Sequence, residues 1–246
     1  EDVDLWEQSL LAMQATGLLM NRVIFIAGKP CSHRELNIAL CSAKPEPWRL
    51  FWNVRWDWMY HGERLNAWTH LVGAVAAFIG AVWLLVIAGM TGDAWKIVSV
   101  AIYGFTLLVL YSASTVYHSV RGRKKAIMQK VDHFSIYLLI AGSYTPFCLV
   151  TLRGPWGWTL FGIVWGLALI GILQEIKPRS EARILSIVIY AVMGWIVLVP
   201  VKPLLAALGS AGFAWLASGG VLYTVGIVFF ALDHRLRHAH GIWHLF

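Results

Sequence analysis

The chain has 246 residues, of which 59% are hydrophobic and only 13% charged, and its formal net charge is +7. This composition excludes an ordinary soluble globular domain, in which about a quarter of the residues are charged. The positive charge does not indicate a nucleic-acid partner, because no basic patch lies on a polar, separately folded module. The composition is that of an integral membrane protein.

The first 62 residues differ from the rest of the chain. Their apolar run, 5–28, is interrupted by polar residues and lacks the basic start and unbroken apolar core of a signal peptide. Residues 48–60 mix aromatic and basic side chains, a pattern typical of a helix that lies in the membrane interface. We expect residues 1–62 to form an N-terminal extension that is either interfacial or disordered, and residues 63–246 to form one transmembrane domain.

Long apolar stretches dominate the remainder. A helix needs about 20 mostly apolar residues to cross roughly 30 Å of hydrocarbon. Six stretches meet this length: 66–88, 96–118, 133–152, 156–174, 184–205 and 211–232. A further helix begins near Ala239 and is cut after eight residues. The predicted fold is an all-α integral membrane protein with six complete transmembrane helices and the start of a seventh, a bundle truncated at its C-terminus.

Three local patterns predict details of this bundle. Gly162 and Gly166 form a pair of small residues four apart in the fourth span, which predicts the close approach of a neighbouring helix. Pro146 and Pro200 predict kinks in the third and fifth spans. Tryptophans at the span ends, such as Trp95, are typical of anchors at the membrane interface.

The distribution of basic residues predicts the orientation. Residues 1–65 carry seven Lys and Arg, 119–131 five, 175–183 three and 233–239 two, whereas each alternate loop carries one. Basic loops usually face the cytoplasm. The N-terminus and the basic loops are therefore predicted to be cytoplasmic.

Few ionisable side chains fall inside the predicted spans. On insertion scales such a group costs about 2.5–3.5 kcal/mol at the centre of the membrane, so each one requires an explanation. With the N-terminus inside, His118, Asp132, His240 and His244 all come to the cytoplasmic side. His70 reaches the same side and is interpreted as a packed or supporting residue.

The spacing of these residues favours a metal site. His240 and His244 are four apart, so they project from one helix face and can bind one ion. Ser114 and His118 have the same spacing. Three neutral histidines with an open fourth position describe a catalytic type of zinc site. Two simpler interpretations stay open: an interfacial histidine is often a polar tip among headgroups, and Asp132 could cap the third helix.

Four segments resemble the hemolysin III family, within the progestin and adipoQ receptor superfamily: ERLNAWTHLVGAVAA (63–77), YSASTVYHS (111–119), VDHFSIYLLIAGSYTPF (131–147) and ALDHRLRHAHGIWHLF (231–246). The resemblance implies a seven-helix protein of the bacterial inner (plasma) membrane with a cytoplasmic N-terminus. It also implies a zinc ion bound by His118, His240 and His244. Asp132 would then hold the water that the zinc activates, with Ser114 beside it.

These patterns and this resemblance predict a zinc-dependent hydrolase of a lipid amide or ester, with Zn²⁺ as cofactor and membrane lipids as partners. Asp132 would be the general base, and Ser114 would orient the water or stabilise the oxyanion. A receptor-like or membrane-homeostasis protein with structural zinc is one alternative, and a pore-forming hemolysin is another. A pore requires a polar stripe along several spans, which the fourth to sixth spans lack.

Overall fold

The computed structural model describes residues 63–176, 179–232, 235–236 and 239–246, without the side chains of 179–183 and 240. The predicted extension of residues 1–62 lies outside this part of the chain. Within it, every regular element is a helix. In chain order these are α3 (Arg64–Met90), α4 (Ala94–Ser119), α5 (Arg123–Pro146), η2 (Phe147–Thr151), α6 (Pro155–Gln174), α7 (Arg179–Trp195), η3 (Ile196–Leu198), α8 (Val201–Ala231) and α9 (Ala239–Trp243).

Five of these helical segments are long and apolar enough to cross a membrane, so the chain is a multi-pass membrane protein. They are α3, α4, α5 continued by η2, α6 and α8. The fifth predicted span, 184–205, does not form one continuous helix. Its apolar helix, Ile184–Leu198, is shorter than the five spans. The described residues thus contain five helices able to span a membrane, and the exact count of six spans plus the start of a seventh is not confirmed. A short helix, α9, begins at Ala239.

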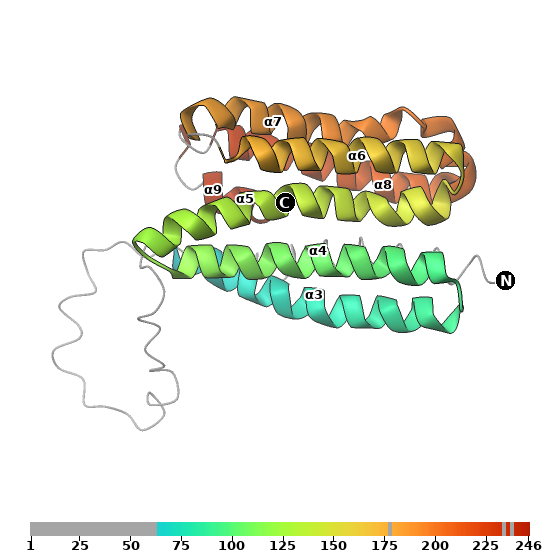
Figure 1. The fold of residues 1–246 in the computed structure, drawn as a ribbon, viewed down its shortest axis with the longest axis horizontal. Coiled ribbons are helices and arrows are strands. Elements are labelled where there is room, and N and C mark those ends of the chain that lie inside the picture. The colour runs from blue at the N-terminus through green and yellow to red at the C-terminus, as the bar shows by residue number, and fades with distance from the viewer. Residues whose placement is uncertain (1–62, 177–178, 233–234, 237–238) are drawn as a thin grey trace, which may run out of the picture.

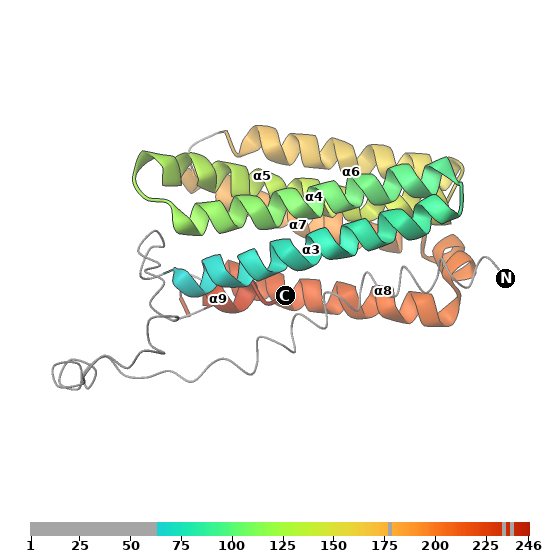
Figure 2. The same cartoon turned by 90° about the horizontal axis from the view of Figure 1, so that it is seen from below.

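The long helices run along one common axis (Figure 1). Helices that follow one another in the chain pack together, α3 on α4, α4 on α5 and α5 on α6. The short helix α9 packs on α8 and lies at the same end of the bundle as the beginning of α3, as both ribbon views show (Figures 1 and 2). The last turn of α4 and the first turns of α5 belong to this end as well.

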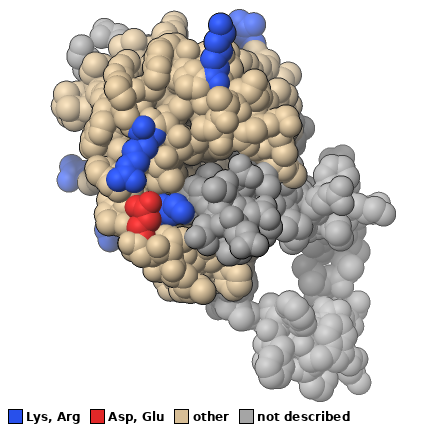
Figure 3. Space-filling model, turned by 90° about the vertical axis from the view of Figure 1, so that its right-hand side faces the viewer, with Lys and Arg blue, Asp and Glu red and all other residues tan. Residues whose placement is uncertain are grey.

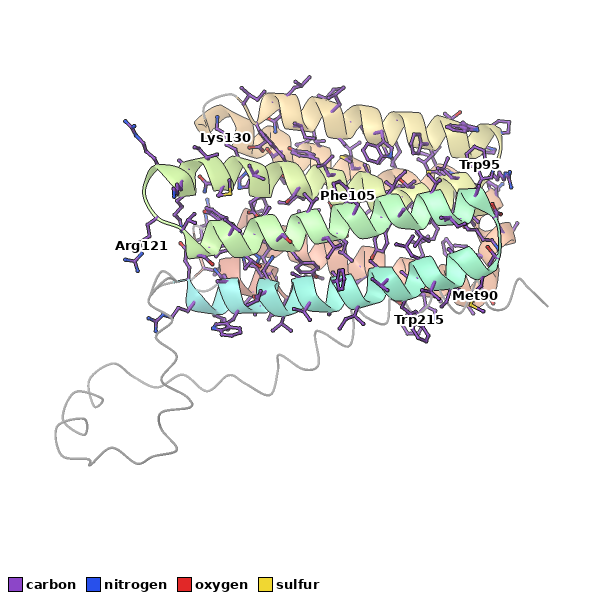
Figure 4. All side chains as sticks on the ribbon, turned by 60° about the horizontal axis from the view of Figure 1, so that its bottom comes forward. Met90, Trp95, Phe105, Arg121, Lys130 and Trp215 are labelled. Carbon is purple, nitrogen blue, oxygen red and sulfur yellow. The ribbon has the colours of Figure 1, made fainter. Side chains whose placement is uncertain are left out.

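The two ends of the bundle differ in charge, as the loop counts predict. Arg121 and Lys130 lie at the end that holds α9, whereas Met90 and Trp95 lie at the opposite end (Figure 4). Figure 3 looks onto that opposite end, where a few basic side chains and an adjoining acidic one interrupt an otherwise uncharged described surface. Between the ends, large apolar side chains such as Phe105 are exposed, which suits a surface that faces lipid.

Prolines and one glycine interrupt the helices. Pro146 ends the α-helical part of α5, and the π-helical turn η2 follows it. Pro200 lies at the junction of η3 and α8, where it separates the two helices instead of bending one. Inside α8, Gly209 has a φ of 67°, a left-handed conformation that glycine adopts without strain, and the helix changes direction there.

The glycine pair of the fourth span does not have its predicted role within the described bundle. A Cβ added at Gly162 or Gly166 would meet no described atom within 4 Å. The close approach in α6 occurs at Gly157 instead, where a Cβ would lie 2.0 Å from the carbonyl oxygen of Cys148 in η2. The spacing of small residues was visible in the sequence, but the face of the helix on which they lie was not.

This difference predicts opposite effects for one substitution at two positions of α6. Gly157→Ala forces a methyl group into the backbone of η2 and is expected to lower the free energy of unfolding by about 1–3 kcal/mol. Gly162→Ala has open space and a better helix former, so it is expected to be neutral or stabilising by up to about 1 kcal/mol. Thermal unfolding of both variants in one detergent measures the difference, and equal midpoints would contradict it.

Candidate metal centre

Three histidines from distant parts of the chain meet at the basic end of the bundle. His70 lies in the second turn of α3, His118 in the last turn of α4, and His244 directly after α9. The ring centroid of His244 is 4.3 Å from that of His70 and 4.9 Å from that of His118, and the rings of His70 and His118 are 6.1 Å apart. The convergence predicted from the charges of the loops therefore holds for these three residues.

A buried carboxylate and a buried hydroxyl lie beside them. Asp132, Ser114 and His118 are 5%, 1% and 1% exposed, so all three are withdrawn from solvent and lipid. The Asp132 carboxylate lies within electrostatic range of both Ser114 and His118. The Ser114 hydroxyl is close enough to hydrogen-bond the Asp132 carboxylate. A carboxylate and a hydroxyl are costly to withdraw from water together, which is typical of a functional site.

The structure does not present a complete set of metal ligands. Among the side chains it describes, no group of three His, Cys, Asp or Glu is arranged to hold an ion. His240 belongs to α9, but its side chain lies outside the described part. His118 and His244 are thus two of the three predicted imidazoles, and nitrogen ligands from histidine beside a carboxylate suit zinc.

Glu63, immediately before α3, forms a hydrogen bond with the Nδ1 edge of the His118 ring. Its Oε2 lies 2.9 Å from His118 Nδ1 and 2.5 Å from the ammonium of Lys125, at the start of α5. Burial alone would raise the pKa of Glu63, but the hydrogen bonds from His118 and Lys125 and the positive charge of Lys125 outweigh it and lower the pKa to about 2. The three residues join α3, α4 and α5.

His70 makes the corresponding contact with the C-terminal segment. Its Nε2 lies 2.6 Å from His244 Nδ1, so a hydrogen bond joins two residues 174 positions apart. Asn66 and His70 are four apart and therefore lie on one face of α3, and Glu63 precedes the helix three residues before Asn66. This face of α3 also approaches α9, because a Cβ at Gly241 would lie 3.4 Å from Asn66 Oδ1. This spacing is visible in the sequence, but Glu63 lies outside the predicted spans and was not among the predicted site residues.

Aromatic contacts with α8 hold the segment that carries His244. The ring of Phe246 stacks on that of Phe229 with centroids 5.6 Å apart, and the ring of Trp243 lies 4.8 Å from that of Phe230. Gly226 allows this approach, because a Cβ there would lie 2.9 Å from Cβ of Phe246. The position of His244 therefore depends on α8 as well as on α9.

A second buried polar cluster joins α5, α6 and α7. Gln174 Nε2 donates hydrogen bonds to the hydroxyls of Tyr137 and Ser186, at 2.9 Å and 2.7 Å, and the Ser186 hydroxyl donates to Glu175. His133 Nδ1 lies 3.3 Å from Glu175 Oε2. His133 lies within α5 and connects this helix to the cluster. The cluster connects three helices and is separate from the histidine group.

Comparison with known proteins finds one matching family model and several proteins of similar sequence. A family model described as Haemolysin-III related matches residues 58–246. The chain is 45% identical to the hemolysin-3 homolog of Bacillus subtilis (strain 168) over 75% of this chain and 86% of that protein. It is 43% identical to hemolysin-3 of Bacillus cereus over 75% and 84% of the two chains. It is 30% identical to the monocyte to macrophage differentiation factor of Homo sapiens over 79% and 82%. No solved structure matches.

Proposed function

The chain belongs to the hemolysin III family, within the progestin and adipoQ receptor superfamily, and from this premise we propose that it is a zinc-dependent membrane hydrolase of a lipid amide or ester. The observation that carries the proposal is the meeting of His118 and His244 beside the buried Asp132 at one end of the bundle. The proposal places this end at the cytoplasmic face of a bacterial inner membrane, because the basic loops gather there.

His118, His240 and His244 are the residues proposed to hold the zinc. When bound, zinc supplies a Lewis acid that acidifies water and polarises a carbonyl group. The Asp132 carboxylate accepts the proton of the attacking water as general base, and its burial keeps competing solvent away. The Ser114 hydroxyl donates a hydrogen bond to the substrate oxygen as negative charge develops on it. The apolar surface of the surrounding helices suits a substrate that arrives from the membrane.

Removal of the metal tests this function. The protein purified in detergent is expected to contain about one zinc per chain and to hydrolyse a ceramide-like amide. A chelator is expected to abolish turnover, and zinc, but not magnesium, is expected to restore it, since magnesium prefers oxygen ligands. Zinc content by elemental analysis and release of the fatty acid are the measurements. Turnover that survives complete removal of the metal would contradict the proposal.

The main alternative is a structural zinc in a receptor-like or membrane-homeostasis protein. Glu63 and His70 tie α3 to α4 and to the C-terminal segment. This end of the bundle is therefore a junction of several helices, which is where a structural zinc would act. In that case the chelator would unfold the bundle, and no lipid amide or ester would be hydrolysed by the zinc-loaded protein. Circular dichroism, recorded before and after chelation, separates the two functions.

A further inference from the structure

A carboxylate outside the proposed ligand set contacts His118, the most buried of the histidines whose side chains the structure describes. Glu63 Oε2 lies 2.9 Å from His118 Nδ1, and the side chain makes no capping hydrogen bond to the start of α3. Its contacts point instead to α4 and α5, through His118 and Lys125. Capping of its own helix therefore does not explain the position of this side chain.

The chemistry of the two groups decides which atom carries the proton. An ionised carboxylate can only accept hydrogen bonds, and the ammonium of Lys125 at 2.5 Å keeps Glu63 ionised. In the contact with Glu63, His118 Nδ1 must therefore be the donor. A neutral imidazole has one N–H, so its lone pair then lies on Nε2, at the opposite edge of the ring, and this atom is buried.

We propose that Glu63 is a positioning residue that holds His118 as the Nδ1–H tautomer and so presents Nε2 as the metal-binding atom. This role rests on the proposed function, because it gives His118 a ligand to bind. A carboxylate that accepts from the second nitrogen of a ligating histidine typically raises metal affinity by about 10–100-fold. Lys125 holds the carboxylate in place and joins this arrangement to the first turn of α5.

The tautomer is measured directly by ¹⁵N NMR of the histidine rings in the zinc-free protein in detergent. The signal of His118 is identified by its loss in His118→Ala, at about pH 8.5, where histidines are in general neutral. Wild-type His118 is expected to be the Nδ1–H form. In Glu63→Gln, the Nε2–H form is expected to gain population, because the amide can donate to Nδ1. Zinc affinity, from competition with a chelating dye, is expected to fall about 10–100-fold.

Glu175→Gln is the matched control, because Glu175 is likewise a glutamate whose Oε2 contacts a histidine Nδ1, that of His133 in the second cluster. It is expected to leave the His118 tautomer and the zinc affinity unchanged. An Nε2–H tautomer in the wild type, or an unchanged affinity in Glu63→Gln, would overturn the inference. A wild type that binds no zinc would overturn the proposed function and, with it, the metal-binding role of Nε2. The tautomer of His118 would still distinguish this outcome from a failure of Glu63 to orient the ring.

Discussion

Asp132→Asn is expected to lower the hydrolysis of a lipid amide by about 10²–10⁴-fold while the protein keeps its zinc. Asparagine has nearly the same shape as aspartate but cannot accept a proton, so the variant removes the general base and leaves the packing of α5 intact. Asp132 is buried beside Ser114 and His118, which leaves few other groups there to replace it. Turnover and zinc content, measured on the same preparation, give the two values.

Asp93→Asn makes the same chemical change at the opposite end of the bundle. Asp93 caps α4 by accepting a hydrogen bond from the backbone of Trp95, and asparagine is an equally good cap. This variant is expected to keep full turnover. Retained turnover in Asp132→Asn would remove Asp132 from the mechanism. Loss of zinc together with turnover would instead make Asp132 a metal ligand.

His118→Ala is expected to reduce the zinc content from about one ion per chain to almost none. The substitution removes one of three proposed nitrogen ligands, and a site of two neutral imidazoles binds zinc weakly. Because a ligand that binds only the folded state stabilises it, the thermal midpoint of the wild type is expected to rise with added zinc and that of the variant to stay constant. Elemental analysis and unfolding scans measure these effects.

His133→Ala serves as the control for the loss of an imidazole. His133 lies in α5, next to Asp132 in the sequence, but its ring contacts Glu175 in the second polar cluster. Its removal is expected to leave the zinc content unchanged. Equal zinc in His118→Ala and His133→Ala would show that the ion binds elsewhere, and equal loss in both would indicate a general effect on folding.

Hydropathy predicts a helix well where the helix begins and ends at the same residues as its apolar stretch. The expected 66–88 and 156–174 agree with α3 and α6 to within two residues at each end. The start of α5 was placed ten residues too late, because residues 123–130 are rich in charge and a helix that continues beyond the hydrocarbon leaves no apolar signal. The fifth span failed for another reason, since Pro200 and the turn η3 divide a stretch that is apolar throughout.

The residues of the candidate site that could be predicted are those whose ionisable side chains lie inside a predicted span, where they cost free energy. His118 and Asp132 were found because a buried ionisable group requires a reason, and charge counting brought them to the same end as His244. Glu63 lies just before α3, where a charge costs little, so that argument does not detect it. The contact of His70 with His244 also escaped, because sequence spacing relates residues within one helix and not across 174 positions.

The separation of 174 positions between His70 and His244 sets the order in which the contacts of the site can form during synthesis. The chain grows at about 5–20 residues per second, so α3, α4 and α5 can pair, and Glu63 can engage His118, well before α9 is made. His244 reaches His70 only after α8 is available to seat Trp243 and Phe246. On the proposed ligation, a ribosome stalled before α9 leaves a nascent chain with most of its helices but without a metal. Zinc would then distinguish chains that contain α9 from chains interrupted before it.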